Sequence, residues 1–423
     1  MQYYSLCNLD ENKWEQVTEI LNQFQVKNLT DFVSLISNFI PIESNNKQEI
    51  ENTLFYLIDN YSEKDLIDTI KNIVNYALKL SELIPSGRLP RLDRNNRLIE
   101  LNRSQILCIL CHMFLCTLNK DKRNLYWVNF DLWFNESTKC TRAYLHALIE
   151  YFREAFELLE KNPNYMSQCI KFEKRILDSE IFDQGLKTRK KLSNFNILLN
   201  GSIGDNGLCE VDFANMDIGY GKSGTQEEIL FASSPEMCVA MLFCDTLQDD
   251  EAITIKGARK IVNFEGYGLD LKYLEKVNFG LKDWSKRVVI AIDAIDFSFC
   301  NDEQECIKVQ MELKNLKREV QKAFVRFSSV SGENIETGHW GCGCFNGNKY
   351  LKAIIQLIAC SLSENNINFY CFRSKDFSDN FRSFLNILYE KDVTLEKLWS
   401  CLTENKFEES DFLQKIIKNI NLE

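Results

Sequence analysis

The stretch that decides how this chain is interpreted is residues 211–236, VDFANMDIGYGKSGTQEEILFASSPE. A strand-like apolar run at 208–213 leads into a glycine-rich loop, and a second apolar segment follows a Gln-Glu-Glu triplet. Glycine lets the backbone approach a ligand closely and leaves its N–H donors uncovered, which suits a diphosphate. The adjacent carboxylates favour chemistry on the attached sugar, because phosphoryl transfer calls for Lys, Arg or a metal instead.

The composition is that of an ordinary globular protein. With 423 residues, 45% of them hydrophobic and 26% charged, the chain can bury a large core and hold two or three domains. The net charge of −11 argues against broad binding to nucleic acid, since that requires clustered Lys and Arg. An anionic polymer would therefore have to be bound at a local site.

No segment predicts a membrane span or an exported protein. No run of about 18 uncharged apolar residues occurs, and the first residues, MQYYSLCNLDENKWEQ, lack the basic and apolar regions of a signal peptide. The sixteen cysteines are scattered, and several lie in apolar helical patterns, so we expect reduced, buried thiols. These features predict an intracellular protein of the nucleus or cytoplasm.

No metal site is expected. The CxxC motif at Cys108 and Cys111 lies in a helical pattern and has no second pair, and the GCGC run at 341–344 lacks the spacing of metal ligands.

The periodicity of apolar residues changes once along the chain. Residues 1–190 have helical spacing, with a loop at 84–96 and with Ser137 or Thr138 as the cap of a helix that runs through 152. Beyond 194, strand-like runs at 195–199, 208–213, 252–256, 287–293 and 367–372 alternate with helical patterns at 235–245, 302–325 and 349–362, and helices return at 376–423. The alternation predicts an α/β layered domain. We expect two parts, a helical accessory region at 1–190 and a catalytic domain at 191–423.

The motifs resemble the signature of the poly(ADP-ribose) glycohydrolase family. The matching residues are VDFAN at 211–215, QEE at 226–228, Phe231, Pro235-Glu236, TGHWGCGCFNG at 337–347, the segment 99–118 and the run 257–267 that ends in FEGY. They follow the family's order over roughly residues 95–375. The resemblance implies an α/β fold, a macrodomain-like mixed sheet flanked by helices, with an N-terminal helical accessory domain.

The resemblance also implies a reaction. It is hydrolysis of the ribose–ribose O-glycosidic bonds of poly(ADP-ribose), with release of ADP-ribose and without metal or cofactor. The expected substrates are poly(ADP-ribose) or ADP-ribosylated proteins. A monomer is expected, with neither nucleic acid nor membrane as a direct partner.

Glu228 is the candidate general acid, since the family assigns that role to the second Glu of QEE. Cleavage needs a proton on the departing oxygen while positive charge builds on the sugar, and a carboxyl group in a partly apolar pocket can supply it. Glu227 is then expected to order the loop or to hold a ribose hydroxyl. The structural alternative is a Glu pair placed at a helix start, where the helix dipole favours acids.

Three further side chains are candidates around these acids. In the family Asp212 and Asn215 help to position the catalytic loop and the ribose, and Gln226 is similarly placed. The alternative is local capping of a loop by short polar side chains.

The glycine loop departs from the family pattern. Three consecutive glycines are replaced by Gly219-Tyr220-Gly221, and the span to QEE shrinks to residues 222–225. Tyr220 is expected to add a side chain where backbone meets the diphosphate, and Lys222 could offset it with a positive charge. If the loop no longer holds substrate, the chain would be a catalytically impaired module that binds ADP-ribose or its polymer.

A second glycine segment is predicted to hold the diphosphate from another side. Backbone N–H groups ahead of a helix that begins near Lys349 form an anion site; its expected residues are Gly341, Gly343, Cys344 and Phe345. His339 replaces an Asn of the family and can donate to a ribose or phosphate, which would add a pH dependence. Tyr267, in a Gly-Tyr-Gly clasp, and Phe372, at the end of a strand, match positions that stack adenine, although a strand-end Phe is more often core.

Overall fold

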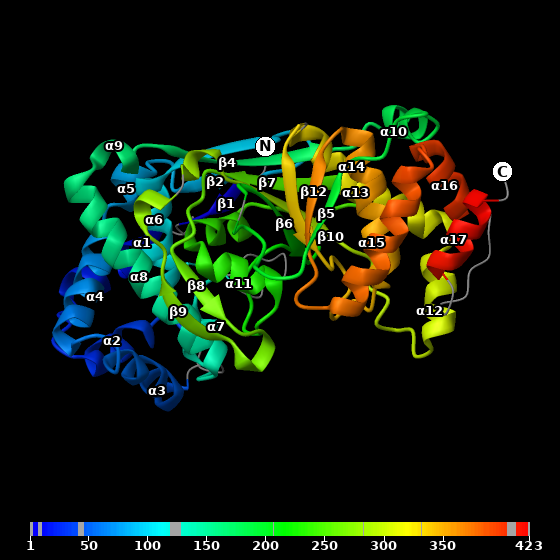
Figure 1. The fold of residues 1–423 in the computed structure, drawn as a ribbon. Helices are drawn as coiled ribbons and strands as arrows, with labels where there is room; N and C mark the ends of the chain where they lie inside the picture. The colour runs from blue at the N-terminus through cyan, green and yellow to red at the C-terminus, as the bar shows by residue number, and fades with distance from the viewer. Residues whose placement is uncertain are drawn as a thin grey trace. The chain divides into compact units, whose positions relative to one another are not determined.

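The computed structural model describes residues 3–6, 11–40, 46–118, 128–205, 207–281, 283–330, 332–403 and 412–421 (Figure 1). It divides into two compact units. The first comprises Met1–Phe172, Asp217–Asp245 and Ile255–Lys286, and the second comprises Glu173–Met216, Thr246–Thr254 and Arg287–Glu423. Among the described residues, no helix combines the length and the apolar character needed to cross a membrane.

The first unit is built mainly from helices. In chain order they are α1 (Glu11–Gln23), α2 (Leu29–Ile36), α3 (Lys47–Ile58), α4 (Glu63–Ala77), α5 (Leu80–Leu83), α6 (Arg103–Phe114), α7 (Asp131–Phe134), α8 (Lys139–Lys161) and α9 (Pro163–Met166). The Thr138 side chain accepts a hydrogen bond from the Thr141 N–H and so caps α8; it is one of the two residues predicted for this role. The helix α8 contacts α3, α4, α6 and α7, so its apolar face forms the centre of this helical group.

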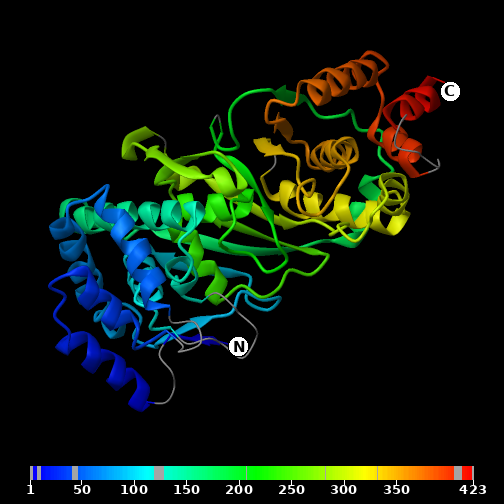
Figure 2. The same ribbon diagram turned by 90° about the horizontal axis from the view of Figure 1, so that it is seen from below.

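Two later stretches of chain complete the first unit. The first holds α11 (Gln226–Ser233) and the 3₁₀ helix η2 (Pro235–Leu242), and the second holds η3 (Gly268–Asp270), η4 (Phe279–Leu281), η5 (Trp284–Lys286) and the antiparallel hairpin of β8 (Val262–Glu265) and β9 (Lys272–Lys276), seen in Figure 2. Near the N-terminus, β1 (Tyr3–Ser5) pairs with β2 (Arg88–Pro90). Both later stretches contact α8, which packs against α11 and β9.

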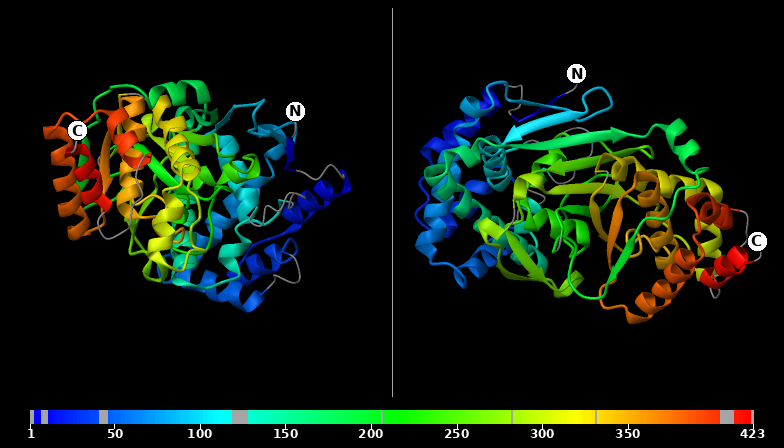
Figure 3. Two further views of the ribbon diagram at one scale, coloured as in Figure 1. Left: turned by 90° about the vertical axis from the view of Figure 1, so that its right-hand side faces the viewer. Right: turned by 45° about the horizontal axis from the view of Figure 1, so that its top comes forward.

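The second unit is a sheet covered by helices. The strand order is β4 (Cys169–Ile176), β7 (Glu251–Lys256), β10 (Val288–Asp293), β6 (Cys209–Ala214), β11 (Asn334–Gly338), β12 (Asn366–Tyr370) and β5 (Phe195–Leu198), with β3 (Leu98–Asn102) next to β4. Figure 3 shows the sheet from two further sides. The pairs β10–β6, β6–β11, β11–β12 and β12–β5 are parallel. Parallel strands are buried on both faces, which explains continuous apolar runs such as VVIAID in β10.

The helices of this unit are α10 (Ser179–Gly185), α12 (Glu303–Gln310), α13 (Leu313–Phe327), α14 (Lys349–Ser363), α15 (Lys375–Glu390), α16 (Leu395–Thr403) and α17 (Phe412–Asn421), with η6 (Ser328–Val330) after α13. Helices α13 and α14 pack on each other, α13 against β10 and α14 against β12. The core includes Val211, Ile290, Ile335 and Leu357, all fully or almost fully buried.

The five strands predicted beyond residue 194 are confirmed, but the uniformly helical prediction for 1–190 is wrong. That region also contains β1, β2, β3 and β4; β2 lies in the predicted loop, and β3 forms the start of the predicted helical segment 99–118. Strand β4, CIKFEKRI, contains the buried Lys174, whose ammonium pairs with Glu251 at 2.8 Å. Because a charged residue stands at a buried position, the alternation of apolar and polar residues that marks a strand is not visible in the sequence. Strand β11, NIETG, was not predicted for the same reason, since Glu336 and Thr337 are buried.

Two helical predictions are also corrected. Residues 235–242 form a 3₁₀ helix rather than an α-helix, and the pattern at 302–325 is two helices, α12 and α13. Neither difference could be predicted from the three-and-four spacing of apolar residues, because that spacing is retained across a short break between helices and in a 3₁₀ helix.

Candidate active site

The glycine loop of the first unit is tied to the helix that follows it. The backbone N–H of Gly219 donates to Oε1 of Glu227 at 2.8 Å, and the Glu227 side chain is buried. A Cβ on Gly219 would lie 2.5 Å from Sδ of Met241, and the residue has a φ of +153°. Only glycine fits here, and Glu227 holds the loop entrance in place.

Glu228 lies at the third position of α11 and is half-buried. Its Oε2 accepts three hydrogen bonds, from Oγ of Ser223 at 2.6 Å, from Oγ1 of Thr225 at 2.8 Å and from the Thr225 N–H at 3.0 Å. Oε1 receives a single longer bond, from the Ser223 N–H at 3.4 Å. A Cβ on Gly221 would lie 2.0 Å from this oxygen. The two oxygens therefore differ: Oε2 holds the loop and Oε1 faces the Gly221 backbone.

Two aromatic donors from the helical part fix the loop backbone. Nε1 of Trp133 donates to the Gly221 carbonyl at 2.7 Å, and the hydroxyl of Tyr144 donates to the Ser223 carbonyl at 2.6 Å. Both side chains are almost fully buried. Neither residue was predicted from the sequence, because both lie about eighty positions before the loop and no local pattern links them to it.

The far end of the loop is held by the segment that carries Tyr267. The Gly268 N–H donates to the Gly224 carbonyl at 2.8 Å, and Sγ of Cys140 donates to the Gly268 carbonyl at 3.0 Å. A Cβ on Gly224 would lie 2.4 Å from the Gly268 carbonyl oxygen, so close approach requires glycine. Tyr267 itself is 60% exposed, and the residue after it bonds the loop that precedes α11 and Glu228.

Tyr220 differs from its predicted role. Its side chain is buried, with ring centroids 5.0 Å from Phe130 and 4.9 Å from Trp133. Its hydroxyl has no hydrogen-bond partner among the described residues. The ring thus packs into the helical part of the first unit instead of covering the loop. Nζ of Lys222, which could add a positive charge near the phosphate, lies 2.7 Å from a carboxylate oxygen of Glu136.

In the second unit, Asp212 lies on β6 and is fully buried. Neither of its carboxylate oxygens has a hydrogen-bond partner among the described residues. Burial, and then the charge of Glu210, raises the pKa of Asp212 to about 8. Asn215 follows the end of β6 and is exposed, whereas Gln226, the first residue of α11 in the other unit, is half-buried.

The second glycine loop closes on itself ahead of α14. The Gly347 N–H donates to the Gly341 carbonyl at 2.8 Å, and Gly341 has a φ of +71°. Asn348 caps α14 by accepting from the N–H groups of the two residues that follow Lys349. The predicted ligand positions of this loop are exposed at Gly343 and Cys344 and half-buried at Gly341 and Phe345.

His339 packs among aromatic rings. Its ring centroid lies 4.7 Å from that of Phe377 and 5.2 Å from that of Phe369, both edge to face. Burial, and then the charge of Lys349, lowers the pKa of His339 to about 4. The imidazole is therefore neutral at neutral pH, and the predicted pH dependence would lie well below pH 7.

Phe372 is not a core residue. It lies beyond the end of β12, has a φ of +48° and is 49% exposed. Its ring centroid is 6.2 Å from that of His339.

The predicted residues form two groups. The first unit brings together Gly219, Tyr220, Gly221, Gln226, Glu227, Glu228 and Tyr267; the second unit carries Asp212, Asn215, His339, Gly341, Gly343, Cys344, Phe345 and Phe372. Within the described part of the chain, no three His, Cys, Asp or Glu side chains are grouped as they would be to hold a metal ion. Cys108 and Cys111 are buried thiols of α6 that form no disulfide bond.

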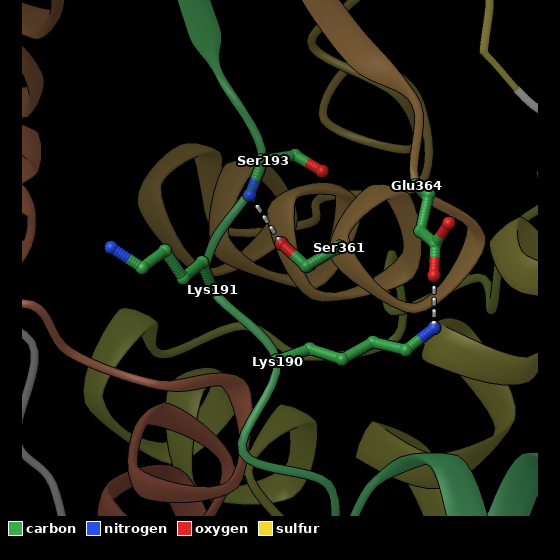
Figure 4. Close-up of a pocket in the computed structure, with 5 residues that line it drawn as sticks. All are labelled: Lys190, Lys191, Ser193, Ser361 and Glu364. Atoms are coloured by element: carbon green, nitrogen blue, oxygen red, sulfur yellow. Dashed lines mark hydrogen bonds and ion pairs between the residues drawn. The ribbon is translucent and has the colours of Figure 1, made fainter.

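A separate surface depression in the second unit, of about 320 Å³, is lined by Lys190, Lys191, Ser193, Ser361 and Glu364 (Figure 4). Its cations are already paired, Lys190 with Glu364 at 2.7 Å and Lys191 with Asp392 at 3.2 Å. It contains none of the predicted site residues and has no evident chemistry.

Two family models match this chain. The one described as the macro domain fold of poly(ADP-ribose) glycohydrolase matches residues 182–379, and the one described as its helical domain matches residues 58–174. The chain belongs to the poly(ADP-ribose) glycohydrolase family. The predicted family and the predicted fold class, a macrodomain-like α/β sheet with an N-terminal helical region, are both confirmed.

Curated relatives agree with this assignment. Poly(ADP-ribose) glycohydrolase 1 of Caenorhabditis elegans is 35% identical over 250 residues, which are 55% of this chain and 31% of the relative. Poly(ADP-ribose) glycohydrolase 2 of the same organism is 34% identical over 51% of this chain and 47% of the relative. The chain thus spans less than half the length of these two relatives.

Two more distant proteins are similar over other shares of the chain. Probable poly(ADP-ribose) glycohydrolase 2 of Arabidopsis thaliana is 24% identical over 73% of this chain and 69% of its own length. The solved poly(ADP-ribose) glycohydrolase of Deinococcus radiodurans, in complex with ADP-ribose, is 14% identical, with a TM-score of 0.34, over 52% of this chain and 95% of that one. A TM-score this low adds nothing to the fold assignment.

Proposed function

We propose that this chain hydrolyses the ribose–ribose O-glycosidic bonds of poly(ADP-ribose) and releases ADP-ribose. The observation that carries the proposal is the position of Glu228 in a family member, where Oε1 faces the Gly221 backbone while Oε2 is held by Ser223 and Thr225. A carboxyl group that is fixed through one oxygen, and whose other oxygen accepts only the long bond from the Ser223 N–H, can deliver a proton to a leaving group with little reorientation.

The proposed reaction begins with protonation of the departing ribose oxygen by Oε1 of Glu228. The C–O bond breaks as positive charge develops on the remaining sugar, and water then adds to that carbon. The Glu228 carboxylate takes up the proton of this water, so the acid is restored at the end of the cycle. Glu227 serves by holding the Gly219 N–H and thereby the loop.

The remaining candidates are proposed as substrate contacts. Gly219 and Gly221 on one loop and Gly341, Gly343, Cys344 and Phe345 on the other would contact the diphosphate, largely through backbone N–H groups. Asp212, Asn215 and Gln226 would hold ribose or the catalytic loop, His339 would donate to ribose or phosphate, and Tyr267 and Phe372 would stack on adenine. The exposure of Tyr267 and Phe372 supports the last role. The contribution of Tyr220 would be its backbone, since its ring packs elsewhere.

The wider setting is proposed from the same family membership. Residues 191–423 would be the catalytic domain and residues 1–190 an accessory region. The hydrogen bonds of Trp133 and Tyr144 to the glycine loop support a direct contribution of residues 1–190 to the site. The partners would be poly(ADP-ribose) or ADP-ribosylated proteins, with neither nucleic acid nor membrane bound directly. The protein would act as a monomer in the nucleus or cytoplasm and would need no metal or cofactor.

The alternative is a module that binds ADP-ribose without cleaving its polymer. The shortened loop favours it, while the two backbone clamps from Trp133 and Tyr144 and the buried Tyr220 ring favour the enzyme, because they preserve an ordered loop. The test is release of ADP-ribose from poly(ADP-ribose) by the purified chain in EDTA. Release supports the hydrolase; no release, together with ADP-ribose binding in calorimetry, supports the binding module.

A further inference from the structure

A buried lysine forms the floor of the second glycine loop. Lys352 on α14 is 1% exposed, and its Nζ lies 4.2 Å from the ring centroid of Trp340. A Cβ on Gly341 would lie 2.9 Å from this Nζ, and a Cβ on Gly347 would lie 2.9 Å from Cε of the same lysine. Both ends of the loop therefore rest directly on the Lys352 side chain, and glycine is required for that contact.

The charges around Lys352 are unequal in number. Lys352 pairs with Glu319, which also accepts from Arg318 at 2.9 Å and from the Ile295 N–H at 3.0 Å. Asp293 pairs with Arg318 and, at 2.7 Å, with Lys322. The network thus contains three cations and two carboxylates, and each of the five side chains is largely buried.

One more acid touches this network, but it lies in solvent. Asp249 pairs with Nε of Arg318 at 2.9 Å, and its side chain is 80% exposed. Charges in water are screened, whereas charges in the interior interact strongly. Among the buried side chains alone, the cations therefore exceed the carboxylates by one, and only the exposed Asp249 offsets the third cation.

An unbalanced buried charge is costly unless another group compensates for it. Burial, and then the charge of Arg318, lowers the pKa of Lys352 well below its usual value and so disfavours its charged form. The ion pair with Glu319 acts in the opposite direction and favours the ammonium. An anion on the outer side of the loop would relieve this cost, and the exposed residues Gly343 and Cys344 lie on that loop. The loop has no cationic side chain of its own between residues 341 and 348.

We infer that Lys352 is the positioning residue of the second glycine loop and supplies, from beneath it, the positive charge that favours a bound diphosphate. The inference rests on the proposed function, since it names the group that makes the loop selective for an anion. Lys352 does not touch the ligand; it acts through the backbone of residues 340–347.

The first test is Lys352→Met, which keeps the length of the side chain and removes its charge. Glu319 retains Arg318 and the Ile295 N–H as partners, so no carboxylate is left unpaired. We expect the Kd for ADP-ribose, measured by calorimetry, to rise about tenfold or more. Lys174→Met is the matched control, because Lys174 is equally buried but pairs with Glu251 on β7. The control variant should bind ADP-ribose within about threefold of the unchanged protein.

The second test is Glu319→Gln, which separates charge from packing. It removes a negative charge beneath the loop, so in a buffer acidic enough to keep Lys352 protonated ADP-ribose should bind as tightly as before or several-fold more tightly. A purely structural role of the pair would weaken binding in both variants. Equal affinity of Lys352→Met and the unchanged protein, or weaker binding by a folded Glu319→Gln, would overturn the inference. If the unchanged protein releases ADP-ribose from the polymer but does not bind free ADP-ribose, the inference alone fails; if it does neither, the proposed function fails as well.

Discussion

The backbone N–H of Gly219 donates to the Glu227 carboxylate at 2.8 Å, across eight residues of chain. Through this bond Glu227, the first of two adjacent acids, holds the glycine loop in place. Glu228, the next residue, turns its Oε1 toward the Gly221 backbone instead. Two neighbouring glutamates therefore have different surroundings, and variants of the loop and of its supports can test whether that difference produces catalysis.

Gly221→Ala should remove activity without unfolding the protein. The new Cβ would lie 2.0 Å from Oε1 of Glu228, so the carboxylate or the loop must move. Because a small displacement of a catalytic group greatly slows the reaction, we expect kcat to fall by about 100-fold or more. Gly280→Ala is the control, since its Cβ would meet only the Asn278 side chain, at 3.7 Å. Full activity in Gly221→Ala would contradict the assigned position of Glu228.

Tyr144→Phe should slow the reaction through the loop. It removes the hydroxyl that donates to the Ser223 carbonyl at 2.6 Å, a loss worth about 1 kcal/mol. We expect kcat to fall several-fold, up to about tenfold, in steady-state assays. Tyr151→Phe on the same helix is the control, because the buried Tyr151 hydroxyl has no partner among the described residues. The control variant should keep its activity and melt at the same temperature or higher.

Substitutions of Tyr220 should affect stability more than binding. Tyr220→Phe removes a hydroxyl that is buried without a described partner, so the melting temperature should stay constant or rise. Tyr220→Ala empties a site between Phe130 and Trp133 and should lower the free energy of unfolding by about 3–5 kcal/mol. Calorimetry on Tyr220→Phe decides the point: a change in ADP-ribose affinity of more than about threefold would indicate that the hydroxyl reaches the ligand.

Asp212→Asn should stabilise the ligand-free protein, and the gain should grow with pH. The folded-state pKa of Asp212 is raised from 3.8 to about 8 by burial, so the folded protein binds the extra proton between these values. The stability that this proton contributes is fully present below about pH 4 and is lost as pH rises through about 8. The difference in melting temperature between the variant and the unchanged protein should therefore increase from pH 4 to pH 8. A difference independent of pH would refute the burial of an uncompensated carboxylate.

The local parts of the site could be predicted from sequence, because each is a contiguous motif. Strand β6, the glycine loop and the start of α11 lie within residues 209–233, and the periodicity marks where strand and helix begin. The sequence also limited the cap of α8 to Ser137 or Thr138, and the structure shows that it is Thr138. The family motifs added the macrodomain assignment, which composition alone could not.

The missed parts depend on contacts between distant segments. Trp133 and Tyr144 bond the loop from helices that carry no motif, and the direction of the Tyr220 ring depends on Phe130 beside it. Charged residues in strands such as β4 and β11 hide the alternation, because tertiary ion pairs make their burial possible.

The central claim is that Glu228, and not Glu227, supplies the proton. The direct measurement is the rate of ADP-ribose release from poly(ADP-ribose) in EDTA by Glu228→Gln, beside its ADP-ribose affinity. Gln can still accept from Ser223 and Thr225, so the fold and the binding should persist while the rate falls by about 100-fold to 10,000-fold. Glu227→Gln should retain more activity, since Gly219 keeps an acceptor. Hydrolysis by Glu228→Gln at the rate of the unchanged protein would contradict the assignment.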